Sequence, residues 1–271
     1  AKQESLVIIL NTPAHNPTGY SLTLEDWDHV IAVLQEEAKC GKAIALVIDA
    51  AYIDFAGDEE EYRRFLPKLE ALPENVLPIM AYSLSKTYTL YGTRCGAMIC
   101  IAKTKEIADE FKRVCEYSSR GSWSNSAKVA QVILSRIYGE PGLLERVDKE
   151  RAHYREMLIK RGRAFEEEAK KVGLKIVPFD AGFFISIPCS DPDAISAKLE
   201  KEGVFIVPLA KGLRVSVASI SEDKCRKLPA IIKAAMEEAN VTPDMSASDI
   251  CDAMEGVMTQ IKVDGLTGSN M

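Results

Sequence analysis

A lysine that lies among hydroxyl side chains, in the run Ser83-Leu84-Ser85-Lys86, is the part of this sequence best suited to covalent chemistry. Arg94 follows eight residues after that lysine. A lysine amine can form a Schiff base with an aldehyde, and serine hydroxyls together with a guanidinium can hold a phosphate dianion. The pattern therefore predicts a site for an aldehyde cofactor that carries a phosphate.

Two further segments complete this predicted site. Residues 13–19 (PAHNPTG) follow the apolar run 6–10, and residues 49–52 (DAAY) follow the apolar run 43–48. Both runs read as buried strands. An acid such as Asp49 at the end of a buried strand is costly unless it meets a cation, and a protonated pyridine nitrogen supplies one. Asn16 and Tyr52 could both donate hydrogen bonds to a ring hydroxyl, so the segments together predict a pyridoxal phosphate site.

In order and rough spacing, these motifs resemble the fold-type I, class I pyridoxal phosphate aminotransferases over about residues 1–240. The matching pieces are HNPTG (15–19), DAAY (49–52), SLSK (83–86), YGTRCG (91–96) and GLRVSVAS (212–219). The resemblance implies that Lys86 is the Schiff-base lysine and proton shuttle, and that Asp49 pairs with the pyridinium nitrogen. It further implies ring-hydroxyl binding by Asn16 and Tyr52, phosphate binding by Ser83, Ser85 and Arg94, and substrate binding by Asn16 and by Arg214, which would grip the α-carboxylate.

A second resemblance concerns substrate choice. Residues 120–125 (RGSWSN) resemble the Arg-x-x-x-Ser-Asn segment of the family, although Ser126 stands where the subgroup usually has proline. In the aspartate and aromatic subgroup, this arginine crosses the dimer interface and binds the side-chain carboxylate of the substrate. The resemblance therefore implies a homodimer with shared active sites. It would act on dicarboxylic or aromatic amino acids and a 2-oxo acid such as 2-oxoglutarate, with Arg120 binding the side-chain carboxylate of the substrate.

Simpler interpretations exist for single residues. Asp49 could be a helix N-cap, Arg214 a salt-bridge partner on an edge strand, and Arg120 an ordinary loop cation. Two other functions also stay open: a β-lyase or decarboxylase that uses the same cofactor and fold, and a catalytically silent relative. The joint occurrence of five motifs in order favours the aminotransferase.

Composition restricts the class of protein. The 271 residues carry a net charge of −6, which implies no general affinity for nucleic acid. Seven scattered cysteines form no C-x-x-C pair, which is typical of reduced thiols and favours a cytoplasmic protein. The resemblance to the aminotransferases further implies a role in amino-acid metabolism and biosynthesis. Three dispersed histidines give no argument for a metal site. The sequence shows no signal peptide and no apolar run of membrane-spanning length, so no membrane partner is expected.

The predicted fold is α/β: a three-layer PLP-transferase large domain with a partial, mostly parallel sheet, and a smaller α+β C-terminal domain. The expected parts are a large cofactor-binding domain over 1–140, a connecting helix over 141–172, a small domain over 173–240 and an extra tail over 241–271. Strands are expected at 6–10, 43–48, 76–82, 97–101, 174–178, 183–188, 204–208 and 213–218. Helices are expected at 24–39, 103–117, 126–138, 143–172, 193–202 and 222–238.

Both ends of the sequence depart from the family pattern. The glycine-rich phosphate loop and the aromatic that stacks on the cofactor ring are not found before residue 15, so the chain is expected to lack the family's N-terminal portion. Residues 261–268 weakly resemble the C-terminal lobe of extracellular amino-acid-binding proteins of transporters. A shortened sensor module and a joined tail are both open interpretations of residues 241–271.

Overall fold

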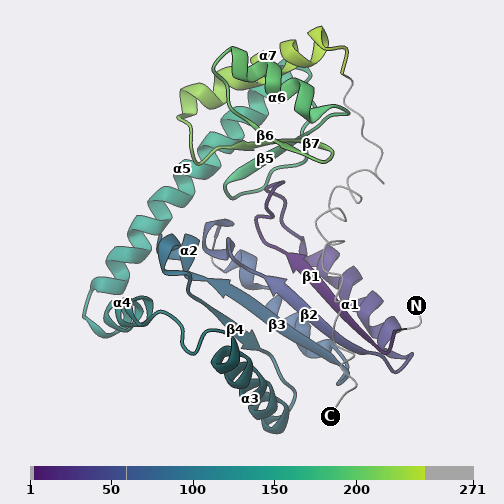
Figure 1. Ribbon diagram of the computed structural model, residues 1–271, viewed down its shortest axis with the longest axis vertical. Helices are drawn as coiled ribbons and strands as arrows, with labels where there is room; N and C mark the ends of the chain where they lie inside the picture. Colours follow the sequence, from purple (N-terminus) through teal and green to yellow (C-terminus); the bar gives the residue numbers. More distant parts are fainter. Residues whose placement is uncertain (1–2, 59, 242–271) are drawn as a thin grey trace. The chain divides into compact units, whose positions relative to one another are not determined.

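The computed structural model describes residues 3–58 and 60–241, and the chain divides into two compact units (Figure 1). The first unit takes in the chain up to Arg161 together with Asp180–Phe183. The second takes in Gly162–Phe179 and the described residues from Phe184 onward. The domain limits expected from the sequence, at 140 and 172, stay a prediction. Apart from Val241, the expected tail lies outside the described residues.

The first unit is built on a four-stranded sheet in the order β1-β2-β3-β4 (Figure 1). The strands are β1 (Ser5–Asn11), β2 (Ala43–Asp49), β3 (Val76–Ser83) and β4 (Gly96–Cys100). The first three run parallel, and β4 pairs antiparallel with β3. The expectation of a mostly parallel sheet is therefore confirmed.

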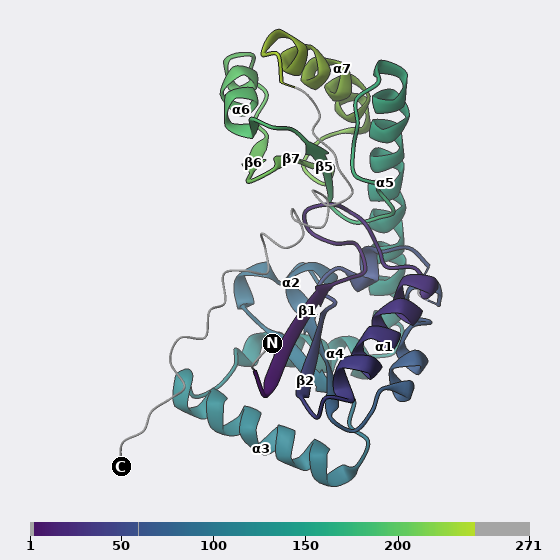
Figure 2. The same cartoon turned by 90° about the vertical axis from the view of Figure 1, so that its right-hand side faces the viewer.

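Helix α1 (Leu24–Ala38) connects β1 to β2 and covers one face of the sheet (Figure 2). It begins with a capping box, in which Thr23 and Asp26 each accept a hydrogen bond from the other's backbone N–H. Its buried residues recur at helical spacing and pack into the core of the unit. One of them, Trp27, stacks on Phe65 with the ring centroids 4.5 Å apart.

Shorter segments follow the strands of the first unit. Four 3-10 turns occupy Ile53–Phe55, Glu61–Arg63, Leu66–Ala71 and Tyr91–Thr93, and the one-turn helix α2 occupies Leu84–Thr87. The longer helices are α3 (Lys105–Ser122), α4 (Lys128–Gly139) and α5 (Leu143–Val172). The long helix expected over 143–172 is thus confirmed, and it begins in the first unit and ends in the second.

The second unit contains a three-stranded antiparallel sheet in the order β5-β7-β6. Its strands are β5 (Phe184–Pro188), β6 (Val207–Leu209) and β7 (Gly212–Ser216), and its helices besides the end of α5 are α6 (Pro192–Lys201) and α7 (Glu222–Glu238). Apolar residues of α5, α6, α7 and the sheet form one core. Gly162 lies in that core where a Cβ would come within 2.0 Å of the Phe179 ring, so a larger residue would clash there.

Two strand predictions for the second unit were wrong. Residues 174–178 form no strand, because they make no ladder: one bond joins them to β5, from the Val177 N–H to the Ser186 carbonyl. Pro178 has no N–H to extend the pairing. The strand expected at 204–208 is shorter and shifted, and begins only at Val207.

Within the described part of the chain, no helix is both long and apolar enough to span a bilayer.

Candidate active site

Three parallel strands bring polar side chains to one edge of the first sheet. Asn11 ends β1, Asp49 ends β2 and Ser83 ends β3. In the strand register Asn11 pairs with Asp49, and Asp49 pairs with Ala81, two residues before Ser83. The carboxyl ends of parallel strands are where α/β proteins bind ligands. The three segments that the sequence singled out therefore meet at the edge where a ligand site is expected.

Asn11 joins the first two of these segments, and sequence reasoning missed it. Its Oδ1 accepts a hydrogen bond from the Asn16 backbone N–H at 2.7 Å, and its Nδ2 donates to the Asp49 carbonyl oxygen at 3.1 Å. Asn11 therefore fixes the HNPTG turn against the end of β2. The available signal was a polar residue directly after an apolar run, the same signal that pointed to Asp49.

His15 is a buried residue of the HNPTG turn. Its Nδ1 lies 2.8 Å from the Thr18 hydroxyl, and its carbonyl accepts from the Gly19 N–H at 2.7 Å. Gly19 has a φ of 77°, a left-handed conformation that glycine adopts readily. Burial lowers the pKa of His15 from 6.5 to about 4, because the charged imidazolium would lose its hydration.

This lowered pKa predicts a loss of stability in acid. Between pH 6.5 and about 4 the unfolded chain binds a proton at His15 that the folded chain does not. The full stability is present above pH 6.5, and about 3 kcal/mol of the free energy of unfolding is lost as the pH falls through this window. Urea unfolding at several pH values measures it. In His15→Gln this part of the slope should vanish; an equal slope in both proteins would contradict the assignment.

Asp49 and Tyr52 form the turn after β2. The Asp49 Oδ1 accepts from the Ala51 N–H at 3.1 Å, so Asp49 closes a local turn and does not cap a helix. The other carboxylate oxygen can accept from a bound group. Tyr52 is buried, and its ring meets the edge of Phe183 at a centroid distance of 5.2 Å.

Lys86 lies on α2, directly after β3. The Ser83 hydroxyl accepts from the Ser85 N–H at 3.2 Å and so starts this short helix. Lys86 is half-buried, and its Nζ lies 5.3 Å from the centroid of the Tyr52 ring and 4.6 Å from that of Tyr91. The amine is therefore held between a residue of the DAAY turn and one of the YGTRCG segment.

Arg94 approaches the same place from the start of β4. Its Nη1 donates to the Tyr91 carbonyl at 2.9 Å and makes a long hydrogen bond of 3.4 Å to the Ser85 hydroxyl. The φ of Arg94 is 51°, an uncommon conformation for a residue with a Cβ. Gly96 permits the tight return, because a Cβ there would lie 2.4 Å from the Tyr82 carbonyl oxygen. Lys86, Ser85 and Arg94 are thus gathered around Tyr91.

The two remaining predicted site residues lie elsewhere. Arg214 is on β7 in the second unit, where its guanidinium carbon lies 4.5 Å from the Phe184 ring centroid. Arg120 is exposed in the last turn of α3, and its Nη1 donates to the Ser124 hydroxyl at 2.6 Å. Within the first unit, Arg120 therefore lies on a different element from Asp49, Tyr52 and Lys86, and Arg214 belongs to the second unit.

The donor set of the first unit fits an aldehyde cofactor with a phosphate and a basic ring nitrogen. Lys86 offers the amine, the hydroxyls of Ser83 and Ser85 with the Arg94 guanidinium suit a phosphate, and Asp49 suits a ring cation. Among residues 3–58 and 60–241, no three His, Cys, Asp or Glu side chains are grouped to hold a metal ion.

Comparison with known proteins agrees with this fold. The family model described as "Aminotransferase class I and II" matches residues 1–232. The chain belongs to this aminotransferase family.

Individual relatives include aminotransferases of aromatic amino acids and of aspartate. The chain is 28% identical over 218 residues to an aromatic amino acid aminotransferase of Cutibacterium acnes. This match covers 80% of this chain and 54% of the relative. It is 28% identical over 226 residues to an aspartate aminotransferase of Salmonella typhi, covering 82% of this chain and 54% of the relative.

The fold is also found in solved structures. The crystal structure of an aminotransferase from Anaerococcus prevotii matches with a TM-score of 0.81 and 39% identity, over 85% of this chain and 56% of that one. An aromatic-amino-acid aminotransferase from Burkholderia pseudomallei, covalently bound to pyridoxal phosphate, matches with a TM-score of 0.69 and 23% identity, over 84% of this chain and 56% of that one. The chain thus spans about half the length of the relatives it matches.

Proposed function

We propose that the protein containing this chain transfers amino groups between amino acids and 2-oxo acids, with pyridoxal 5′-phosphate held by Lys86. The observation that carries this proposal is the position of the Lys86 amine, between the rings of Tyr52 and Tyr91 and beside the Ser85–Arg94 pair. The family membership and the activities of the named relatives support it.

Each predicted site residue of the first unit has a definite role in this proposal. Asp49 accepts a hydrogen bond from the protonated ring nitrogen, and Asn16 and Tyr52 donate to the ring hydroxyl. Ser83, Ser85 and Arg94 bind the phosphate through two hydroxyls and one guanidinium. Arg94 already lies next to the Ser85 hydroxyl, so part of the phosphate site is arranged in advance.

The chemistry divides between the cofactor and the protein. When bound, the cofactor supplies an electron-withdrawing ring that acidifies the α-proton of an attached amino acid. Lys86 would hold the cofactor covalently, and its Nζ, when free, would accept the α-proton of the substrate and later return a proton. Asp49 keeps the ring nitrogen protonated, and Arg214 holds the substrate α-carboxylate by a bidentate pair.

The reaction type, assembly and location belong to the same proposal. We favour a homodimer with shared active sites, acting on dicarboxylic or aromatic amino acids with 2-oxoglutarate in cytoplasmic amino-acid biosynthesis. A β-lyase or decarboxylase would use the same cofactor site. The relatives are named as aminotransferases, which favours transamination over a lyase or a decarboxylase reaction.

A product analysis separates the reactions. The protein with pyridoxal 5′-phosphate is incubated with glutamate and a second 2-oxo acid. Transamination yields 2-oxoglutarate and the new amino acid in equal amounts, without ammonia or carbon dioxide. Release of carbon dioxide in step with glutamate loss would identify a decarboxylase, and ammonia released together with a 2-oxo acid from an amino acid that carries a leaving group on Cβ, with no turnover of glutamate, would identify a β-lyase. Either outcome would overturn the proposal.

Replacing Arg120 tests the substrate preference. If Arg120 binds the side-chain carboxylate of the substrate in a dimer, Arg120→Ala should lower kcat/KM for aspartate and glutamate by about 30-fold or more. The values for phenylalanine and alanine should change little. Arg113→Ala is the matched control, because Arg113 is an exposed arginine of the same helix that pairs with Glu110.

Mixed dimers test whether sites are shared. With aspartate, dimers of Arg120→Ala alone should be strongly impaired and dimers of Lys86→Ala alone should be inactive. Mixing the two variants should raise the activity above the sum of the two, since one site then combines two intact halves. If Arg120→Ala lowers kcat/KM equally for all four substrates, or not at all, Arg120 serves only its bond to Ser124.

A further inference from the structure

Asp54 is a buried carboxylate with no role in the site described above. It lies in the 3-10 turn Ile53–Phe55, two residues after Tyr52, and is 8% exposed. A buried charge of this kind is costly unless cations and hydrogen-bond donors surround it.

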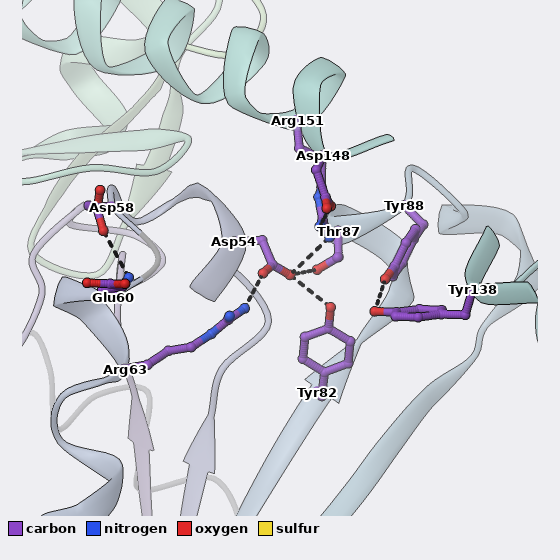
Figure 3. Close-up of polar contacts among 10 residues, drawn as sticks. All are labelled: Asp54, Asp58, Glu60, Arg63, Tyr82, Thr87, Tyr88, Tyr138, Asp148 and Arg151. Carbon is purple, nitrogen blue, oxygen red and sulfur yellow. Dashed lines mark hydrogen bonds and ion pairs between the residues drawn. The ribbon is translucent and has the colours of Figure 1, made fainter. Parts of the chain in front are cut away.

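The Asp54 carboxylate gathers donors from three other parts of the first unit (Figure 3). Its Oδ2 accepts from the Tyr82 hydroxyl at 2.8 Å and from the Thr87 hydroxyl at 2.8 Å. Its Oδ1 accepts from Arg63 Nη2 at 2.8 Å, and Arg151 Nη1 lies 3.8 Å from Oδ2. Two guanidinium groups therefore balance the charge while two hydroxyls bind one oxygen.

Tyr82 and Thr87 bracket the segment that carries the lysine. Tyr82 is in β3 and precedes Ser83, and Thr87 directly follows Lys86 at the end of α2. We propose that Asp54 is a positioning residue, whose carboxylate ties Tyr82 and Thr87 together and thereby fixes the Lys86 amine beside Tyr52. This proposal rests on the proposed function of Lys86.

The chemistry of the cluster requires an ionised carboxylate. An ionised carboxylate is acceptor-only, so all four neighbours can face it with N–H or O–H groups. Burial raises the pKa of Tyr82, and the nearby Asp54 charge raises it further, so its hydroxyl stays protonated and donates. An asparagine of the same shape would turn an NH₂ group toward one of these donors.

The lysine segment borders open space on one side. Leu84 and Tyr88 border a largely apolar cavity of about 440 Å³, which Arg63 and Tyr82 also line. The backbone of the turn is closed by bonds of 3.2 Å from the Tyr88 N–H to the Leu84 carbonyl and from the Thr89 N–H to the Lys86 carbonyl. When the carboxylate ties are lost, the turn has room to open toward the cavity.

Amide hydrogen exchange tests the positioning role without any cofactor. In the full chain, Asp54→Asn should speed exchange at the Tyr88 and Thr89 amides by about tenfold or more, because hydrogen bonds to a charged acceptor are lost. Thr87→Val and Tyr82→Phe each remove one tie and should give smaller increases in the same amides. These milder variants keep the test decisive if Asp54→Asn fails to fold.

Asn75→Ala is the matched control. Its Nδ2 donates at 2.9 Å to the Ala38 carbonyl and at 2.7 Å to the Lys42 carbonyl, so it also joins elements of the first unit. Asn75 precedes β3, at the opposite end of the strand from Lys86. Its loss should lower overall stability and leave the Tyr88 and Thr89 amides at their wild-type rates relative to the rest of the sheet.

Reductive trapping supplies the second measurement. Pyridoxal 5′-phosphate is added, borohydride fixes it to any lysine it has joined, and peptide mapping gives the labelled fraction at Lys86. Asp54→Asn and Thr87→Val should lower this fraction at limiting cofactor by about tenfold, and Asn75→Ala should not. If wild-type Lys86 is never labelled, the proposed function fails, while the exchange rates still decide the role of Asp54.

Unchanged exchange at Tyr88 and Thr89 in Asp54→Asn, Thr87→Val and Tyr82→Phe would overturn the proposal. So would an equal increase in the Asn75→Ala control, because Asp54 would then only stabilise the unit as a whole.

Discussion

Lys86→Ala is expected to lower turnover by at least about four orders of magnitude, because it removes both the covalent attachment point and the group that moves the α-proton. The absorbance of the cofactor bound to the protein should change as well, since no amine is left to join the aldehyde. Turnover is measured with glutamate and a 2-oxo acid on the cofactor-loaded protein.

A lysine outside the site provides the control for this variant. Lys39 is exposed and forms an ion pair with Glu36 on the surface of α1. Lys39→Ala should keep the wild-type turnover and the wild-type absorbance. An unchanged cofactor absorbance in Lys86→Ala would show that another lysine holds the cofactor, and would remove the basis for the proposed site.

Asp49→Asn is expected to lower turnover by about 10²–10³-fold and to weaken cofactor binding. Both effects come from the loss of the negative charge of the carboxylate. An asparagine keeps an Oδ1 that can accept from the Ala51 N–H, so the local turn survives while the counter-charge for the ring nitrogen is lost. The measurements are turnover and the cofactor dissociation constant.

Asp49→Ala separates the two roles of this side chain. It removes the turn acceptor as well, so it should lower the free energy of unfolding by about 1 kcal/mol more than Asp49→Asn does. If Asp49→Asn keeps nearly full activity and only Asp49→Ala is impaired, Asp49 serves the turn and does not contact the cofactor.

Much of the first unit was predictable because its signals are local. Each parallel strand is an apolar run that ends at a polar residue, and each end meets the same edge of the sheet. The motifs at Asp49 and Lys86 directly follow such runs. Their grouping therefore follows from the parallel order of the strands, which the alternation of strands and helices already implied.

Side-chain contacts across the sequence were not predictable in this way. Asp54 meets Tyr82 and Thr87, about thirty residues further on, only because two strand ends are neighbours. The run Ile53-Asp54-Phe55 carries no sequence signal that indicates which residues Asp54 contacts. Asn11 could be singled out as a polar residue after an apolar run, but its two hydrogen-bond partners are backbone groups of other segments, and no sequence pattern marks such partners.

The errors in the second unit have a related cause. Residues 174–178 have the apolar composition of a strand, yet a strand also needs a ladder of backbone hydrogen bonds to its neighbour. The segment meets the edge strand β5 through the bond from the Val177 N–H to the Ser186 carbonyl, Pro178 has no N–H to continue the pairing, and Leu174 packs into the core. Composition predicts burial better than it predicts pairing.

Trapping the cofactor on Lys86 before and after adding glutamate tests the central claim most directly. The protein is loaded with pyridoxal 5′-phosphate and reduced with borohydride, and the labelled peptide is identified by mass spectrometry. The proposed site predicts a label on Lys86 that largely disappears when excess glutamate is added before reduction, because the substrate amine releases the lysine. A label on a different lysine, or a Lys86 label that glutamate does not diminish, would contradict the proposed function.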